Sequence, residues 1–126
     1  MSRPAVTVFV WGLYEYLVAA TLLFAPGLLG MLGMPVDELV WIRISAGVVA
    51  VVGTVFVHAA RNEYTSFFRA SVGIRIVVGA YFAALVVATG APVVILAFAA
   101  ADLAGAAWTG LTLRGVRPAV GVPTAS

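Results

Sequence analysis

The sequence contains no cysteine and a single histidine among its 126 residues. Without cysteine, the chain cannot form disulfides, thiolate zinc sites or iron–sulfur clusters, and it has no thiol nucleophile. One histidine also excludes a metal site built from several histidines of one chain. From these two shortages we expect a protein that works without a metal and without a cofactor.

Charged residues are scarce, and lysine is missing altogether. Charged residues make up 10% of the chain, with a net charge of +2, whereas soluble domains carry about 25%. The arginines are scattered rather than clustered with aromatic residues, which argues against a nucleic-acid partner. A chain with so few charges cannot cover a surface that faces water.

Apolar residues take the place of the missing charges. They make up 63% of the sequence, and the mean hydropathy is +1.13. Four apolar stretches each come close to the roughly 20 residues that a helix needs to cross a membrane. They cover residues 5–24, 39–60, 67–88 and 91–113. Because backbone groups inside lipid need internal partners, we predict four helices. The expected fold is an all-α, up-down four-helix bundle embedded in a membrane.

Loop charges predict the orientation of this bundle. With four crossings, both termini and the polar link 61–66 lie on one side of the membrane, whereas Asp37 and Glu38 lie on the other. The first side carries most of the arginines: Arg3, Arg61, Arg69, Arg114 and Arg117. The positive-inside rule therefore places both termini in the cytoplasm, in a bacterial-type inner (plasma) membrane.

The first apolar stretch also resembles a signal peptide, but Glu15 interrupts it and no small-residue cleavage site follows. We therefore expect a retained helix. The links between the predicted helices are too short to separate domains, so we expect one transmembrane domain over residues 1–114. Residues 115–126 are rich in Pro, Gly and small residues and predict a disordered cytoplasmic tail.

Three ionisable residues, Glu15, Arg75 and Asp102, lie near the middles of three different stretches. At about 1.5 Å per residue, they lie roughly 12 to 16 Å from one end of their stretches, near the midplane of a membrane about 30 Å thick. An unpaired charge at that depth costs at least about 2.5 to 3.5 kcal/mol. We therefore predict that the three side chains point inward and meet, with Arg75 bridging the two carboxylates.

One arginine cannot fully neutralise two carboxylates. We therefore expect one of the two to hold a proton, as general acid–base catalysis requires, and interpret Glu15, Arg75 and Asp102 as catalytic residues. In the alternative interpretation, the three charges only fix how the helices pack. The functional interpretation is preferred because ionisable groups inside a membrane generally mark functional sites.

Other side chains are candidates for binding a ligand beside these charges: Trp11, Tyr14, Arg43, Ser71, Tyr81, Phe98 and Thr109. Small residues on the same faces, such as Gly79 and Gly105, allow close helix approach or leave room for a ligand. We interpret Trp41, Tyr64 and Trp108 as anchors at the membrane interface. We also interpret His58 as interfacial, with haem ligation as the alternative.

The order of these features resembles the DoxX-like family of small bacterial four-helix membrane proteins and neighbouring uncharacterised families. Four stretches carry the resemblance and together span the chain up to Arg114: YEYLVAATLLFAPGLLGMLGMP, WIRISAG, RASVGIRIVVGAY and DLAGAAWTGLTLR. The resemblance implies a fold rather than a reaction. It also emphasises the polar positions within these stretches: Glu15, Arg43, Arg75 and Asp102.

Two classes of function fit this pattern best. The first is an enzyme without a cofactor that isomerises, cyclises or opens an epoxide in a lipophilic small molecule, because these reactions need only proton transfers. The alternative is a non-catalytic accessory or structural subunit of a larger membrane enzyme complex. A transporter or proton pathway requires more helices than one chain offers, so it requires a homo-oligomer. The expected partners are the lipid bilayer, a lipophilic small molecule, and further copies or a larger membrane enzyme.

Overall fold

The computed structural model describes residues 1–115, and these residues form five α-helices and no β-strand. The helices are α1 (Arg3–Phe24), α2 (Pro26–Met31), α3 (Leu39–Arg61), α4 (Thr65–Thr89) and α5 (Ile95–Arg114). All but α2 are long and apolar enough to cross a membrane. The prediction of an all-α chain with four long apolar helices is confirmed. The tail predicted to be disordered lies, beyond Gly115, outside the described residues.

The helix ends follow from local capping. Helix α1 begins at Arg3 because the Ser2 hydroxyl oxygen accepts a hydrogen bond from the Ala5 N–H at 3.2 Å, as N-capping serines do. Helix α4 ends at Gly90, which adopts the left-handed backbone with φ of 69°. The prediction that the last helix starts at residue 91 was wrong. Residues 91–94 complete the reversal after Gly90, and α5 begins only at Ile95.

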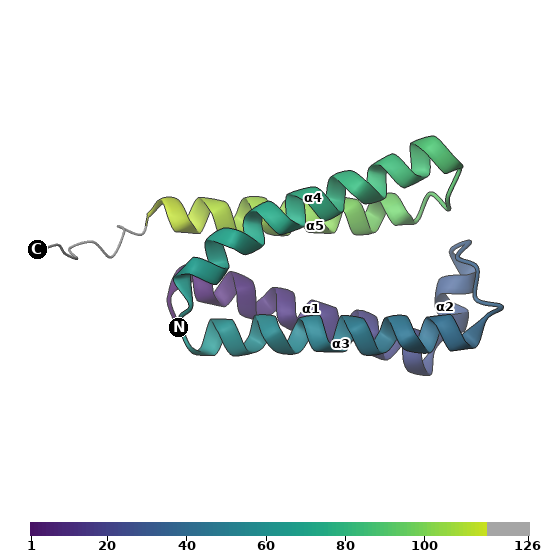
Figure 1. Ribbon diagram of the computed structural model, residues 1–126, viewed down its shortest axis with the longest axis horizontal. Coiled ribbons are helices and arrows are strands. Elements are labelled where there is room, and N and C mark those ends of the chain that lie inside the picture. Colours follow the sequence, from purple (N-terminus) through teal and green to yellow (C-terminus); the bar gives the residue numbers. More distant parts are fainter. Residues whose placement is uncertain (116–126) are drawn as a thin grey trace, which may run out of the picture.

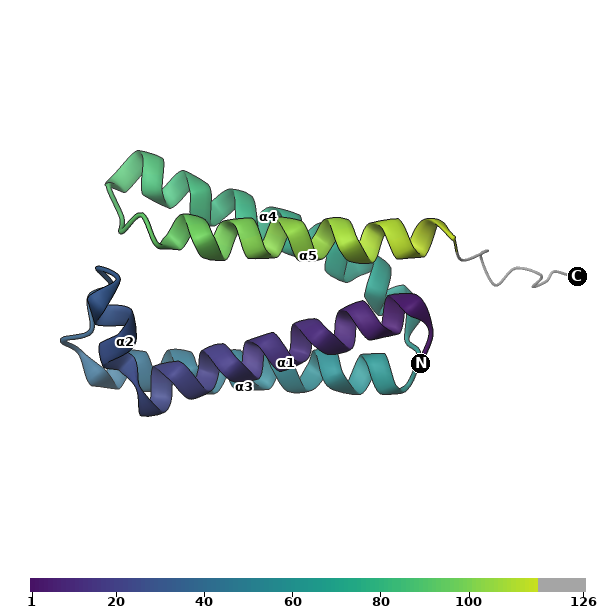
Figure 2. The same ribbon diagram turned by 180° about the vertical axis from the view of Figure 1, so that it is seen from behind.

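The long helices form two antiparallel pairs, α1 with α3 and α4 with α5 (Figure 1). The pairs come together at the end that holds the α3–α4 link, which we call the core end. They diverge toward the opposite end, where α2 lies, and the view from behind shows the same divergence (Figure 2). Sequence analysis missed α2, which starts with Pro26 at a position where proline favours helix initiation.

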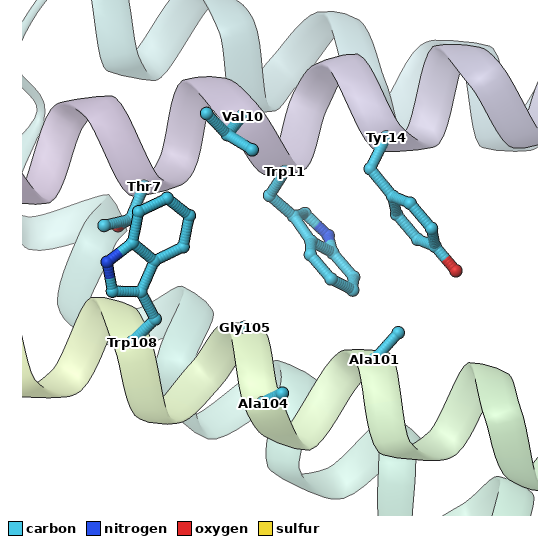
Figure 3. Close-up of a pocket in the computed structure, with 8 residues that line it drawn as sticks. All are labelled: Thr7, Val10, Trp11, Tyr14, Ala101, Ala104, Gly105 and Trp108. Carbon is cyan, nitrogen blue, oxygen red and sulfur yellow. The ribbon is translucent and has the colours of Figure 1, made fainter.

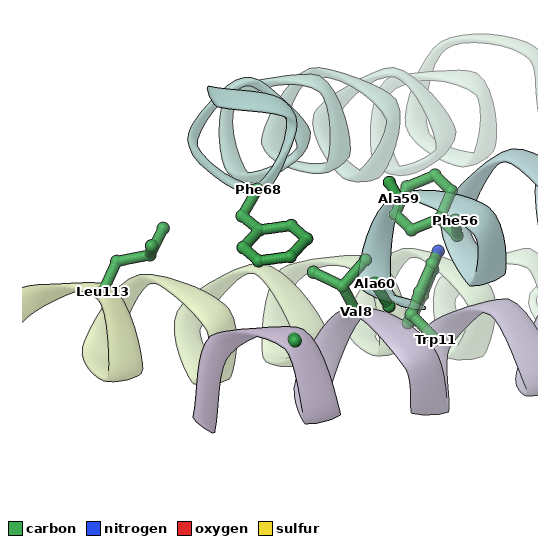
Figure 4. Close-up of a cluster of buried hydrophobic side chains, with 8 residues drawn as sticks. Val8, Trp11, Phe56, Ala59, Ala60, Phe68 and Leu113 are labelled. Carbon is green, nitrogen blue, oxygen red and sulfur yellow. The ribbon is translucent and has the colours of Figure 1, made fainter. Parts of the chain in front are cut away.

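The hydrophobic core is concentrated near the core end (Figure 4). All four long helices contribute to it: Ala5, Val8, Trp11, Phe56, Ala59, Ala60, Phe68 and Leu113. No residue of α4 beyond Gly79 is buried. The two helical pairs are therefore held together mainly at one end, and Arg75 lies where the packed part gives way to the diverging part.

A bond between the N-terminus and the α3–α4 link closes the core end. The backbone N–H and the hydroxyl of Ser2 donate to the two carboxylate oxygens of Glu63, at 2.6 and 2.7 Å. Glu63 has a left-handed backbone with φ of 54°, which is uncommon for a residue with a side chain. These two donors lower the pKa of Glu63 below its ordinary value.

We predict that Glu63→Gln lowers thermal stability modestly, by about 1 kcal/mol or less, because the bond is exposed to water. Since the folded pKa of Glu63 is lowered, the stabilisation is present above the unfolded value of about 4.3 and is lost as the pH falls through the lower folded pKa. Thermal unfolding in detergent between neutral and acidic pH measures both effects. Glu38→Gln, which changes an exposed acid, is the control; an equal loss in both variants would contradict the prediction.

Candidate binding site around Arg75

Arg75 projects from α4 into the junction of all four long helices and is only 2% exposed. Its Nη2 donates to the Thr109 hydroxyl of α5 at 2.7 Å. Its guanidinium carbon lies 5.0 Å from the ring centre of Trp11 on α1 and 5.8 Å from that of Phe56 on α3. Both distances fall within the range of cation–π attraction. Longer bonds run from the guanidinium to the backbone oxygen and hydroxyl of Ser71.

The bond to Thr109 continues as a chain of hydroxyls into α1. The hydroxyl oxygens of Thr109 and Thr7 lie 2.7 Å apart, and the Thr7 hydroxyl donates to the Pro4 carbonyl oxygen at 2.7 Å. Each hydroxyl has one proton. Because Thr7 gives its proton to Pro4, Thr109 donates to Thr7 while it accepts from Arg75. The chain of hydrogen bonds therefore runs in one direction, and it occupies the hydroxyl proton of Thr109, a residue predicted to bind a ligand.

Arg75 does not bridge the two carboxylates, contrary to the prediction. Its hydrogen-bond partners among the described residues are Ser71 and Thr109 alone. Helical side chains lean toward the N-terminus of their own helix. Helix α4 begins at the core end whereas α5 ends there, so Arg75 and Asp102 lean in opposite directions. The guanidinium therefore meets α5 near Thr109 and Gly105, one to two turns closer to the core end than Asp102.

One nitrogen of Arg75, Nη1, is buried and has no hydrogen-bond partner among the described residues. A Cβ added to Gly105 would lie 2.9 Å from this nitrogen, so the missing side chain of Gly105 makes room for it. A buried donor without an acceptor costs about 1 to 3 kcal/mol, and more when the group is charged. Nη1 of Arg75 is therefore a buried, charged donor for which the described residues supply no acceptor.

The two carboxyl groups lie nearby, and the Trp11 side chain is close enough to Glu15 to act on its carboxyl group as a hydrogen-bond donor. Asp102 is 8% exposed, and Glu15 is half-buried. The charges of both carboxylates act on Arg75. Counted along the helices from the core end, Arg75 lies at about 15 Å and the two acids at about 18 Å. By this count the three groups lie at a similar level along the helices, without direct pairing.

A groove of about 260 Å³ lies between α1 and α5 (Figure 3). Eight residues line it: Thr7, Val10, Trp11, Tyr14, Ala101, Ala104, Gly105 and Trp108. The Trp11 and Tyr14 rings lie against each other with centres 4.8 Å apart. Trp11 and Gly105 form the part of the wall that separates the groove from the free nitrogen of Arg75. The groove is open on its outer side.

The remaining predicted site residues are dispersed. Phe98 is half-buried, one turn before Asp102, and Arg43 is exposed near the start of α3. Tyr81 is 60% exposed and packs only against the neighbouring Phe82 ring, so the structure does not place it with the cluster. His58 is exposed, contacts the ring of Tyr64, and lines a second hollow of about 470 Å³ between α1 and α3.

Sequence analysis missed several residues of this site. It treated Trp108 as an interface anchor, whereas the structure places Trp108 in the groove wall. It also overlooked Thr7, which lies one helical turn before Trp11 and eight residues before Glu15. That spacing puts Thr7 on the same face of α1 as Trp11 and Glu15. The sequence could have indicated Thr7 through this spacing alone.

Comparison with known proteins gives no further guide, since no family model, curated protein or solved structure significantly matches the chain. The resemblance to DoxX-like proteins stays a prediction that depends on the quoted stretches alone.

Proposed function

We propose that this chain is an integral membrane protein that binds a lipophilic small molecule beside Glu15, Arg75 and Asp102 and converts it by proton transfer. Its outer surface supports the membrane location. Large apolar side chains such as Leu17, Phe24 and Val87 are 66%, 81% and 86% exposed. Soluble monomers rarely expose extended apolar surface of this kind, whereas lipid tails cover it without cost.

The distribution of arginines supports the proposed orientation. Arg3, Arg61 and Arg69 lie near the core end, where both α1 and α4 begin and α3 ends. The α2 end carries Asp37 and Glu38. We therefore propose that the core end faces the cytoplasm of a bacterial-type inner membrane.

The observation that carries the binding proposal is the buried nitrogen of Arg75 that lacks an acceptor. A charge that only held the helices together would gain most from complete pairing. Here the guanidinium is fixed by Thr109 and by the rings of Trp11 and Phe56, while one N–H group is left without a partner. A ligand oxygen would supply the missing bond. Arg75 would then hold the ligand close to both carboxyl groups.

Two nearby carboxyl groups allow proton transfer in both directions. In an epoxide, for example, one carboxyl group gives its proton to the ring oxygen as a C–O bond breaks. The other carboxylate takes a proton from the neighbouring carbon, so a double bond forms and the product is an isomer of the substrate. Arg75 stabilises negative charge that develops on the oxygen. Isomerisation and cyclisation of other lipophilic substrates use the same two transfers.

We predict that Glu15→Gln and Asp102→Asn, made separately, each lower conversion of the bound molecule by about 100-fold, the typical contribution of a general acid or base. The ligand is identified by mass spectrometry of an organic extract of the protein purified in mild detergent, and then supplied to each variant. Glu38→Gln and Asp37→Asn are matched controls, because they make the same changes at exposed acids near the α2 end.

Full conversion by both cluster variants would contradict the proposed chemistry. Retained ligand together with loss of a co-purifying protein would instead favour the alternative of an accessory subunit. In that case Glu15 and Asp102 serve assembly rather than catalysis.

A further inference from the structure

The geometry points to the class of ligand and to the route by which it arrives. We propose that an uncharged lipid with an oxygen acceptor in its head reaches Arg75 from the bilayer, through the groove between α1 and α5. This inference rests on the proposed function, because it assumes that the cluster binds a lipophilic molecule. It adds the chemistry of the ligand head, the groove as its path, and two residues, Trp11 and Gly105, that control access.

The route follows from what separates the groove from the free nitrogen. A Cβ at Gly105 would lie 2.9 Å from Nη1 of Arg75 and 2.9 Å from two ring carbons of Trp11. Both Gly105 and Trp11 line the groove. A small rotation of the Trp11 ring therefore brings Nη1 to the groove surface at Gly105, which has no side chain to block it.

The charges around the site favour an uncharged head. With one acid protonated, as the proposed proton transfer requires, Glu15, Arg75 and Asp102 carry no net charge. A carboxylate or phosphate head would then add negative charge close to the remaining carboxylate, where low polarity strengthens repulsion. A carbonyl, epoxide or hydroxyl oxygen accepts the Arg75 hydrogen bond without adding charge. Other than the Thr7 and Tyr14 hydroxyls and the indole N–H groups, the groove wall is apolar, which also suits a neutral molecule.

The size of the groove indicates how much of the ligand it holds. At about 30 Å³ for each water-sized unit, a volume of 260 Å³ accommodates roughly nine such units. That suffices for a head group and the first carbons of a chain or ring, but drug-sized ligands generally occupy about 300 to 1,000 Å³. The rest of a longer molecule extends through the open side of the groove into lipid.

The test uses three probes of equal chain length: hexadecan-2-one, palmitic acid and hexadecane. They are titrated into the full-length protein in nanodiscs, in a Trp41→Phe background. Trp41 is exposed on α3, whereas the two remaining tryptophans, Trp11 and Trp108, both line the groove. We expect a saturable change in tryptophan fluorescence with the ketone and none with the alkane. Palmitate should bind about tenfold more weakly or worse, because of the added charge.

Two variants obstruct the proposed route in different ways. Gly105→Ala places a methyl group against Arg75 and Trp11, and Ala104→Leu fills the groove from its outer side without touching Arg75. Each has a matched control on α5. Gly110→Ala has no heavy atom closer than 3.8 Å, and Ala107→Leu changes an exposed residue outside the groove. We expect about tenfold weaker ketone binding in both obstructing variants and unchanged binding in both controls. If Gly105→Ala fails to fold, Ala104→Leu decides the question.

Equal ketone binding in the obstructing variants and their controls would overturn the route. Tighter binding of palmitate than of the ketone would overturn the uncharged head, and the absence of saturable binding by any probe would overturn the inference as a whole. Failure of the proposed function looks different. It appears as full conversion of the extracted ligand by Glu15→Gln and Asp102→Asn, whatever Gly105→Ala does. The reverse outcome is also distinct. If Glu15→Gln and Asp102→Asn lose conversion while Gly105→Ala and Ala104→Leu bind the ketone normally, the proposed function holds and only the route through the groove is wrong.

Discussion

Methionine in place of Arg75 should abolish ligand retention while leaving the protein folded and at least as stable as the wild type. Methionine fills a comparable volume and adapts its shape to irregular gaps. It removes the one group in the described residues that offers a free buried N–H. No remaining side chain next to Gly105 then offers a donor to the ligand, so we expect at least about 100-fold weaker retention, as for the loss of a charged hydrogen bond.

The stability of this variant follows from comparing magnitudes. The substitution loses the bond to Thr109 and the contacts with two aromatic rings, each worth about 0.5 to 2 kcal/mol. It gains by no longer burying a charge with an unpaired nitrogen, which costs several kcal/mol. The lost contacts and the relieved burial cost therefore roughly cancel in the free energy of unfolding, or leave the methionine variant slightly more stable. If Arg75 were only a structural lock, its removal should instead cost about 3 to 5 kcal/mol.

Thermal unfolding in detergent and mass spectrometry of the extracted ligand provide the two readouts for Arg75→Met. Arg69→Met is the matched control, because it removes an exposed arginine from the same helix. We expect Arg69→Met to retain the ligand. Two outcomes would contradict a binding role for Arg75. In the first, Arg75→Met still retains the ligand. In the second, Arg75→Met is much less stable than the wild type and the wild type itself carries no ligand.

Much of the fold could be predicted because apolar stretches of membrane-spanning length leave few alternatives to helices. The number and type of the long helices therefore followed from hydropathy. Helix ends were harder. Pro92 suggested a helix start, but the left-handed Gly90 ends α4 and the reversal needs the residues up to Val94. Helix α2 was missed because six residues are too few to show a periodic pattern.

The candidate site could be predicted only in part, for a geometric reason. Depth along each helix depends only on residue number, and it places Glu15, Arg75 and Asp102 at one level. Whether side chains at one level meet depends on the direction in which each leans. Arg75 and Asp102 lie on antiparallel helices and lean apart, so the arginine found Thr109 instead. Thr109 and Gly105 were both named from the sequence, but the sequence could not show that Thr109 accepts the bond from Arg75 or that Gly105 leaves room for its free nitrogen.

Alanine at Gly53 should weaken the pairing of α1 with α3 and displace Glu15. The two helices touch through their backbones at this point. A Cβ at Gly53 would lie 3.0 Å from the Gly12 backbone oxygen and 3.1 Å from the Glu15 Cβ. Both neighbours belong to or lie next to the helix backbone, so the contact is relieved only if α1 moves away.

The cost of this displacement should be about 1 to 3 kcal/mol, as for other overpacked positions. Alanine favours the helix over glycine by about 1 kcal/mol, which offsets part of that cost. Gly47→Ala separates the two contributions. It makes the same change in the same helix, where nothing lies within 4 Å of the added Cβ, so it should leave the protein as stable as before or slightly more stable. Thermal unfolding of the two variants side by side measures the difference.

Because Glu15 moves with α1, Gly53→Ala should also reduce conversion of the extracted ligand, whereas Gly47→Ala should not. Equal stability and equal conversion in both variants would mean that α1 and α3 accommodate a methyl group where the structure leaves no room for one.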